Sequence, residues 1–341
     1  MPSKVGRRWR LVVAGAVLPA GLVAGLAGEA ASLPQRAAPA GEEHAATHGP
    51  DGVDLDSRGR GRVGAPAAVY EVDAPAPWSA SEYDGAVHTT DQPDLTTLAT
   101  FHAIYLHPAD SKSRFPQFAA MFQADARQAS SLLATLYGRG IRLDERAGAG
   151  GARYLDITVV RSRYRARQLS GGNQFSLVAN ELAAKGFTSP DKKYAVWLDA
   201  GSQACGQGHL YQDTRRTAAN SNEGRTTAIV YRPYSAADAS GGFCRGRTLR
   251  HELGHNMGAL QQVAPHAFDG AHCDDSAEDT MCYTSAASVD TGAPAFDHGN
   301  DDYWDPVAAG GSARLPWWTV NLSRFVCPPG GDCTRPNTPE F

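Results

Sequence analysis

The stretch HELGHNMG, residues 251–258, constrains the fold more than any other feature of this sequence. His251 and His255 are four positions apart, so on a helix their imidazoles lie on one face, one turn from each other. Glycine commonly follows the last residue of a helix, so Gly258 indicates where this helix ends. The segment therefore predicts a helix over residues 247–258 whose two histidines face the same way.

Two imidazoles so placed can bind one zinc ion at about 2.0–2.1 Å. Glu252 is adjacent in sequence and points to the flank of the same face, where it can take a proton from a water molecule activated by the ion. The alternative is a salt-bridged surface helix that happens to carry two histidines. The position of this helix, after several predicted strands in a chain with an export signal, favours the metal site.

Downstream, the stretch HCDDSAEDTMCY at residues 272–283 contains a methionine, Met281, followed two positions later by Tyr283. The pattern H-E-x-x-H-x-x-G followed by a methionine turn resembles the metzincin zinc endopeptidases. The chain is also similar to exported actinobacterial proteins related to the snapalysin and reprolysin-like peptidases, through HCDD, MCY and DDYWDP. This resemblance extends over most of residues 98–326. It implies that Met281 lies beneath the metal and that Tyr283 helps to bind the metal or the oxyanion.

The third metal ligand departs from the metzincin pattern. That pattern places histidine or aspartate three residues after the motif glycine, but here the position is Gln261, whose amide oxygen is a weak ligand. We expect the ligand in the following loop, with His272 first, because a disulfide between Cys273 and Cys282 would hold it beside the methionine turn. The alternatives are His266, which follows Pro265, and the carboxylates of Asp274, Asp275 and Asp279.

The N-terminus predicts export. A basic start, an apolar stretch over residues 11–28 and small residues near Ala30 are typical of a signal peptide, here residues 1–30. Glycines and a proline make the apolar stretch a weak permanent membrane span. Residues 31–95 are rich in Ala, Pro, Gly and charge, which predicts a disordered linker or pro-segment, in which the histidines are solvated. Residues 96–341 would then form the zinc peptidase domain.

The cysteines are consistent with an exported protein. All six lie after residue 200, none forms a C-x-x-C pair, and disulfides are therefore expected rather than a thiolate zinc site. By proximity we predict the pairs 205–244, 273–282 and 327–333. The acidic stretch FDHGNDDYWD, residues 296–305, allows either an acidic surface loop or a Ca²⁺ site formed by Asp297, Asn300, Asp301 or Asp302.

Hydrophobic runs predict strands at residues 100–108, 152–164, 192–200 and 226–233. Helices are predicted at residues 115–138, 174–186 and 247–258. The order of the globular part is thus β-α-β-α-β-β-α, followed by a loop-rich tail. With the resemblance, it predicts an α+β, zincin-like fold with a twisted mixed sheet, covering helices and an active-site helix. The formal net charge of −4 argues against a nucleic-acid partner. We predict a secreted, monomeric zinc endopeptidase acting on protein or peptide substrates. The alternatives are a catalytically weak zinc-fold protein that binds a peptide or surface partner, which Gln261 leaves open, and a structural exported protein with an incidental motif.

Overall fold

The computed structural model describes residues 43–47, 54–55, 61–62, 83–202, 204–233, 244, 246–276, 278–282, 295–305 and 315–339. The chain divides into two units, Met1–Ala37 and Ala38–Phe341, and all described residues belong to the second. The predicted signal peptide lies outside the described residues. Of the helices in the described part, none has the length and apolar character needed to cross a bilayer.

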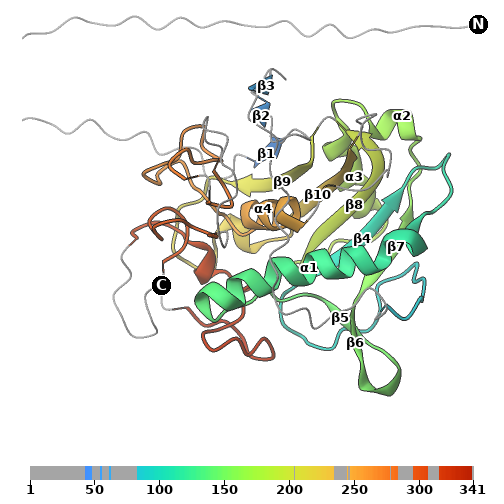
Figure 1. Ribbon diagram of the computed structural model, residues 1–341, viewed down its shortest axis with the longest axis horizontal. Coiled ribbons are helices and arrows are strands. Elements are labelled where there is room, and N and C mark those ends of the chain that lie inside the picture. Colours follow the sequence, from blue (N-terminus) through green and yellow to red (C-terminus); the bar gives the residue numbers. More distant parts are fainter. Residues whose placement is uncertain are drawn as a thin grey trace, which may run out of the picture. The chain divides into compact units, whose positions relative to one another are not determined.

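A mixed six-stranded sheet organises the second unit, in the order β1-β9-β10-β8-β4-β7 (Figure 1). The strands are β1 (Glu43–Thr47), β9 (Gly206–Tyr211), β10 (Thr227–Pro233), β8 (Lys192–Ser202), β4 (Thr100–His107) and β7 (Ile157–Arg161). Strands β10, β8, β4 and β7 run parallel to one another. β9 is antiparallel to β10, and β1 is antiparallel to β9.

The remaining elements are short or cover the sheet. Two small hairpins pair β2 (Asp54–Leu55) with β3 (Gly61–Arg62) and β5 (Glu145–Ala147) with β6 (Arg153–Leu155). The α-helices are α1 (Phe115–Tyr137), α2 (Ala166–Leu169), α3 (Gln174–Ala184) and α4 (Gly246–Asn256). Short 3-10 turns occur at Ala149–Gly151, Ser221–Glu223 and Val320–Leu322.

Alternate residues of the central strands supply two separate cores, because successive side chains of a strand point to opposite faces. On β8, Ala195 and Trp197 join the core that also contains residues of α1 and α4, whereas Val196 and Leu198 join the core that contains residues of α3. The strands β4 and β10 alternate in the same way. The sheet is thus covered on both faces, and α4 lies on the same face as α1 (Figure 1).

Most of the predicted elements are present. Predicted strands correspond to β4, β8 and β10, and predicted helices correspond to α1, α3 and α4. The strand predicted within residues 152–164 is divided at Asp156, with β6 pairing to β5 and β7 pairing to β4. The three predicted disulfides, 205–244, 273–282 and 327–333, are confirmed.

The prediction was wrong to omit β9. Its sequence, GQGHLY, contains two glycines, which weaken the strand signal because glycine has low β-propensity. Both glycines are needed for tertiary packing. A Cβ atom added at Gly206 would collide with the Glu252 carboxylate, and one added at Gly208 would lie 2.9 Å from the Glu252 carbonyl oxygen. The strand therefore passes so close to α4 that only glycine fits.

Candidate metal centre

Helix α4 carries the two motif histidines on one buried face. His251 and His255 are both buried, and their Nε2 atoms lie 2.9 Å apart. Two imidazole nitrogens at this distance share either a proton or a cation. Two ligands bound to one zinc ion at about 2.0–2.1 Å must lie within about 4.2 Å of each other, so this pair is close enough to bind a single ion.

The end of α4 explains why its sequence closes with glycine. Gly258 has a φ of +83°, and its N–H donates to His255 O at 2.9 Å. The N–H of Ala259 donates to Gly254 O, also at 2.9 Å. These two bonds form a Schellman motif, in which the left-handed residue is usually glycine. The chain thereby turns sharply just after the second histidine.

Gln261, at the position of the expected third ligand, has a different role. Its side chain is fully buried, and its Nε2 donates to Gly258 O at 2.9 Å. The amide thus satisfies a backbone carbonyl just beyond the end of α4. An aspartate at this position could not donate that hydrogen bond.

The third histidine of the group comes from the loop that follows. His251, His255 and His272 each offer a ring nitrogen, and these atoms lie within 4.8 Å of one another. The ring of His272 stacks on that of His251, with centroids 5.4 Å apart and planes inclined by 22°. The disulfide between Cys273 and Cys282 joins this loop to the methionine turn next to His272. The disulfide therefore fixes the loop end that carries the third imidazole.

Outer hydrogen bonds set the orientation of two of the three rings. His251 Nδ1 lies 2.7 Å from Thr280 O, and a carbonyl can only accept, so Nδ1 carries the proton. His272 Nδ1 lies 2.7 Å from Asp269 Oδ2, while Asp269 Oδ1 accepts hydrogen bonds from the backbone N–H groups of Ala271 and His272. In a neutral ring with Nδ1 protonated, Nε2 is the nitrogen with the lone pair. Carbonyl and carboxylate partners of this kind orient metal-binding histidines.

Burial keeps the two helix histidines, His251 and His255, neutral. It lowers the pKa of His251 and of His255 well below the usual range, and the neighbouring imidazoles lower it further. Burial raises the pKa of Asp269, but the hydrogen bonds from His272 and the backbone more than offset this, and the net pKa is lowered. His251 and His255 are therefore neutral, and the Asp269 carboxylate that contacts His272 is charged. Neutral imidazole is the form that binds metal ions.

Glu252 lies between α4 and β9. It is fully buried, and burial raises its pKa well above the usual range. A Cβ atom at Gly208 would lie 3.0 Å from Glu252 Oε2 and 3.2 Å from the Cβ of His255. The carboxylate is therefore packed against the backbone of β9, beside the second histidine.

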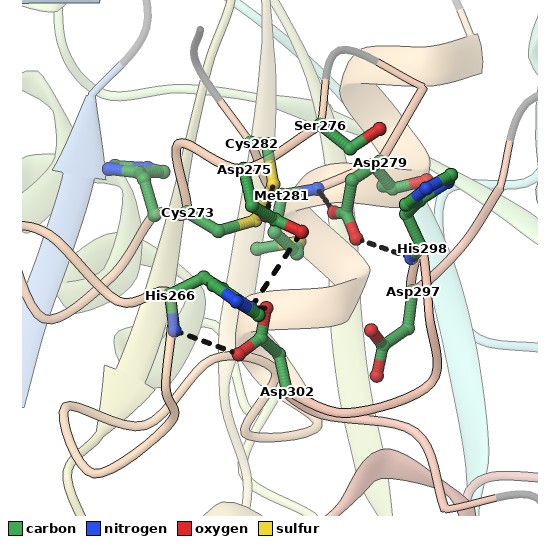
Figure 2. The surroundings of a disulfide bond; sticks show 12 residues. His266, Cys273, Asp275, Ser276, Asp279, Met281, Cys282, Asp297, His298 and Asp302 are labelled. Carbon is green, nitrogen blue, oxygen red and sulfur yellow. Dashed lines mark hydrogen bonds and ion pairs between the residues drawn. A yellow bond between two sulfur atoms is a disulfide. The ribbon is translucent and has the colours of Figure 1, made fainter.

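A buried acidic network supports the methionine turn (Figure 2). Met281 is fully buried, and its Sδ would lie 2.9 Å from a Cβ at Gly254 of α4. Asp279 accepts hydrogen bonds from the backbone N–H of Met281 at 2.6 Å and of His298 at 2.8 Å. Burial raises the pKa of Asp279 to about 7. Asp297 lies below this turn, and burial followed by the charge of Asp279 raises its pKa to about 8.

His266, the alternative third ligand, is not part of the histidine group. Its Nδ1 lies 3.1 Å from Asp302 Oδ2 and 3.7 Å from an oxygen of Asp275 (Figure 2). Asp302 is fully buried and also accepts a hydrogen bond from the backbone N–H of His266 at 3.1 Å. The ring of His266 is thus held in a cluster of ion pairs with Asp302 and Asp275. Asp302, one of the residues named for calcium, takes part in this cluster.

Several residues proposed from the sequence for the metal or calcium site make other contacts, and one lies outside the described residues. Tyr283 falls outside the described residues. The carboxylate of Asp297 accepts the backbone N–H of Tyr303 at 2.7 Å and that of Trp304. Asp275 pairs with His266, and Asp279 supports the methionine turn. In the described chain neither of these two carboxylates belongs to the group formed by the three histidines.

Sequence reasoning missed Asp269 and the glycines of β9. The stretch DGAH at residues 269–272 carries a signal for Asp269, because an aspartate often accepts hydrogen bonds from N–H groups two and three positions later. The glycines carried no comparable local signal, since their purpose depends on a helix about forty residues away.

The donor set fits zinc. Three buried imidazoles converge, and the Nδ1 atoms of His251 and His272 are oriented by oxygen acceptors. Three protein ligands would leave a fourth tetrahedral position open, as in catalytic rather than structural zinc sites. His251, His255 and His272 are the residues that would bind the ion.

The support from Asp269 is testable. Replacing Asp269 by asparagine should weaken zinc affinity roughly 10–100-fold, since the amide is a weaker acceptor for the ring N–H of His272. Asp275→Asn is the matched control, because it changes a carboxylate of the same loop that pairs with His266 instead. Competition with a zinc chelator of known affinity measures both. Equal affinities in Asp269→Asn and the parent would contradict the assigned support.

Comparisons with known proteins give only partial matches. No protein-family model matches the chain, and no curated protein matches it. Wild-type OgpA from Akkermansia muciniphila is similar in two crystal forms, at 12% identity and TM-scores of 0.30 and 0.31. Catalytically inactive OgpA in complex with an O-glycopeptide substrate, glycodrosocin, matches at 10% identity and a TM-score of 0.30. The matches cover 52% of this chain, which spans about half the length of these structures. At this similarity they determine neither the fold nor the activity.

Proposed function

We propose that this protein is a secreted zinc-dependent endopeptidase of metzincin type. One observation carries the proposal: three buried imidazoles converge beside a buried glutamate that precedes the second histidine by three residues. A site that only bound zinc would need the histidines but not a general base. The three disulfides are consistent with an exported chain.

The proposed chemistry is hydrolysis of a peptide bond. Zinc, when bound, supplies a Lewis acid that polarises a carbonyl group and lowers the pKa of water. Glu252 would take the proton from the attacking water and then transfer it to the leaving amine, as a general base followed by a general acid. Burial of this carboxyl group raises its affinity for a proton, which suits the first of these steps.

The residues around the site support these roles. Met281 packs beneath α4 at Gly254, which is where a methionine turn would support the metal from below. Tyr283 is proposed from the sequence alone as a group that stabilises the oxyanion. Asp269 and the carbonyl of Thr280 would keep the rings of His272 and His251 in the orientation that metal binding needs.

Metal removal tests the proposed function. The purified exported protein should bind about one zinc ion per chain and cleave members of a mixed peptide library. Removing the ion with a chelator should reduce cleavage to the level of the buffer blank, because the Lewis acid is lost. Adding one equivalent of zinc should restore it. A zinc-loaded chain that cleaves no peptide in the library would instead favour a zinc-fold binding protein.

A further inference from the structure

Four arginines lie within seven residues at the end of strand β7. Residues 161–167 have the sequence RSRYRAR, and all four arginine side chains are exposed. The formal net charge of the chain is −4, and subtracting these four positive charges leaves −8 for the rest of the chain. The run is therefore a concentrated positive region on a chain that is otherwise negative.

The fold places a second loop beside this run. β4 and β7 are parallel neighbours, so their C-terminal ends meet at the same edge of the sheet. The N–H of Ala109, after β4, donates to Tyr164 O at 2.8 Å. Asp110 accepts a hydrogen bond from the N–H of Ala166 at 2.8 Å, and the exposed Lys112 follows two residues later. Five exposed basic residues of these two loops form what we call the basic edge: Lys112, Arg161, Arg163, Arg165 and Arg167.

A buried glutamate fixes the backbone beneath the arginines. Glu181 of α3 is 1% exposed and accepts hydrogen bonds from the N–H of Arg163 at 2.7 Å and from the hydroxyl of Ser162. It also lies 3.8 Å from Lys185 Nζ. The Glu181 carboxylate thus binds the loop backbone and a lysine rather than a guanidinium group.

The guanidinium groups of the run remain available to a ligand. Arg161 donates to a backbone carbonyl, and Arg163 donates to the hydroxyl of Tyr164 at 2.9 Å and lies over its ring. Among the described residues, no carboxylate forms an ion pair with any of the four arginines. Arg153, which is also exposed, instead pairs with Glu145 at 2.7 Å. Like charges without counter-charges repel one another, and a bound polyanion relieves that repulsion.

We propose that the basic edge binds a flexible polymer of phosphodiester-linked polyol units, of which poly(glycerol phosphate) is the simplest, and so retains the protein on surfaces that carry such polymers. The planar guanidinium group binds phosphate oxygens through two parallel hydrogen bonds. Several arginines in one short run match a chain of phosphates rather than a single anion. The proposal is independent of zinc and of the proposed peptidase activity.

Two other polyanions fit the basic edge less well. Binding in a bilayer interface requires exposed apolar side chains, and the large ones exposed in the described chain lie outside both loops: Val87, Leu95, Leu136, Val263 and Phe268. Single-stranded nucleic acids stack their bases on aromatic rings. The aromatic residue of the run, Tyr164, is half-buried and covered by Arg163.

The salt dependence of binding tests the proposal on the full chain. Fluorescence anisotropy of labelled poly(glycerol phosphate) should be measured at several NaCl concentrations. The logarithm of the parent's affinity should fall with the logarithm of salt concentration with a slope of roughly −3, since each contact to a single phosphate chain contributes about 0.7. In Arg165→Gln/Arg167→Gln the slope should fall to about half, and affinity at low salt should drop roughly tenfold.

The matched control is Arg153→Gln/Arg225→Gln. It makes the same change in net charge at two exposed arginines near the starts of β7 and β10, at the opposite edge of the parallel strands. This control should bind the polymer like the parent. Circular dichroism should show that both double variants are folded.

The other outcomes overturn the proposal. Parent binding with no salt dependence, or no binding at all, would remove the basic edge as a polyanion site. Equal losses in both double variants would show an effect of net charge rather than a site. Tighter binding to phosphatidylglycerol vesicles would replace the polymer by a membrane, and tighter binding to an oligothymidylate with the same number of phosphates would replace it by a nucleic acid.

Discussion

Replacing Glu252 by glutamine is expected to remove peptide cleavage while zinc stays bound. The amide has nearly the same shape, so it can remain packed between α4 and the glycines of β9. It cannot take up a proton from water, and a positioned general base contributes roughly 10²–10⁴-fold to the rate. The zinc content should be unaffected, because the three imidazoles that would bind the ion are unchanged.

The same substitution at Glu278 provides the matched control. Glu278 is in the loop before the methionine turn, its side chain is 41% exposed, and it lies 3.8 Å from His298. Glu278→Gln should retain the activity of the parent. Zinc per chain and the cleavage rate of one peptide substrate should be measured on all three proteins. Full activity in Glu252→Gln with normal zinc content would remove Glu252 from the proposed mechanism.

The second large effect is expected at His272. Replacing it by alanine removes one of the three converging imidazoles, and an ion held by two protein ligands should dissociate during purification. Affinity should fall by more than the roughly 10–100-fold caused by loss of an outer partner of a ligand. The expected zinc content is near zero, against about one ion per chain in the parent.

His266→Ala is the control for this prediction, because His266 is the other loop histidine considered for the site. Its ring pairs with Asp302 and Asp275 and is not part of the histidine group of the described chain. Its loss should leave zinc content unchanged and should cost stability through the buried carboxylate of Asp302. Elemental analysis of both variants, with circular dichroism to show that each is folded, decides between them. Zinc retained in His272→Ala but lost in His266→Ala would transfer the third ligand to His266.

Much of the fold could be predicted because it depends on local pattern. Helices α1, α3 and α4 and strands β4, β8 and β10 follow from hydrophobic runs bounded by proline, glycine or polar residues. The disulfide pairs followed from proximity in sequence, and all three are present. Local signals of this kind are independent of the rest of the chain.

Strand β9 could not be predicted from its local sequence. Its two glycines are required by close packing against helix α4, which is distant in sequence. By local propensity the stretch GQGHLY has a weak strand signal. In the folded chain, those glycines allow β9 to approach the Glu252 carboxylate without a Cβ between them. The pairing of β1 with β9 was unpredictable because residues 43–47 have no hydrophobic alternation, which is the local signal of a strand.

The sequence by itself determined the helix, the spacing of His251 and His255 and the adjacent Glu252, since a helical repeat places residues four apart on one face. It left the third imidazole open between His272 and His266, because a loop of unknown path can bring either one to the helix. Only the tertiary structure decided which of them lies there. The Schellman turn after α4, the disulfide 273–282 and the hydrogen bond from His272 to Asp269 bring His272 to the group, while Asp302 and Asp275 hold His266 in a separate cluster.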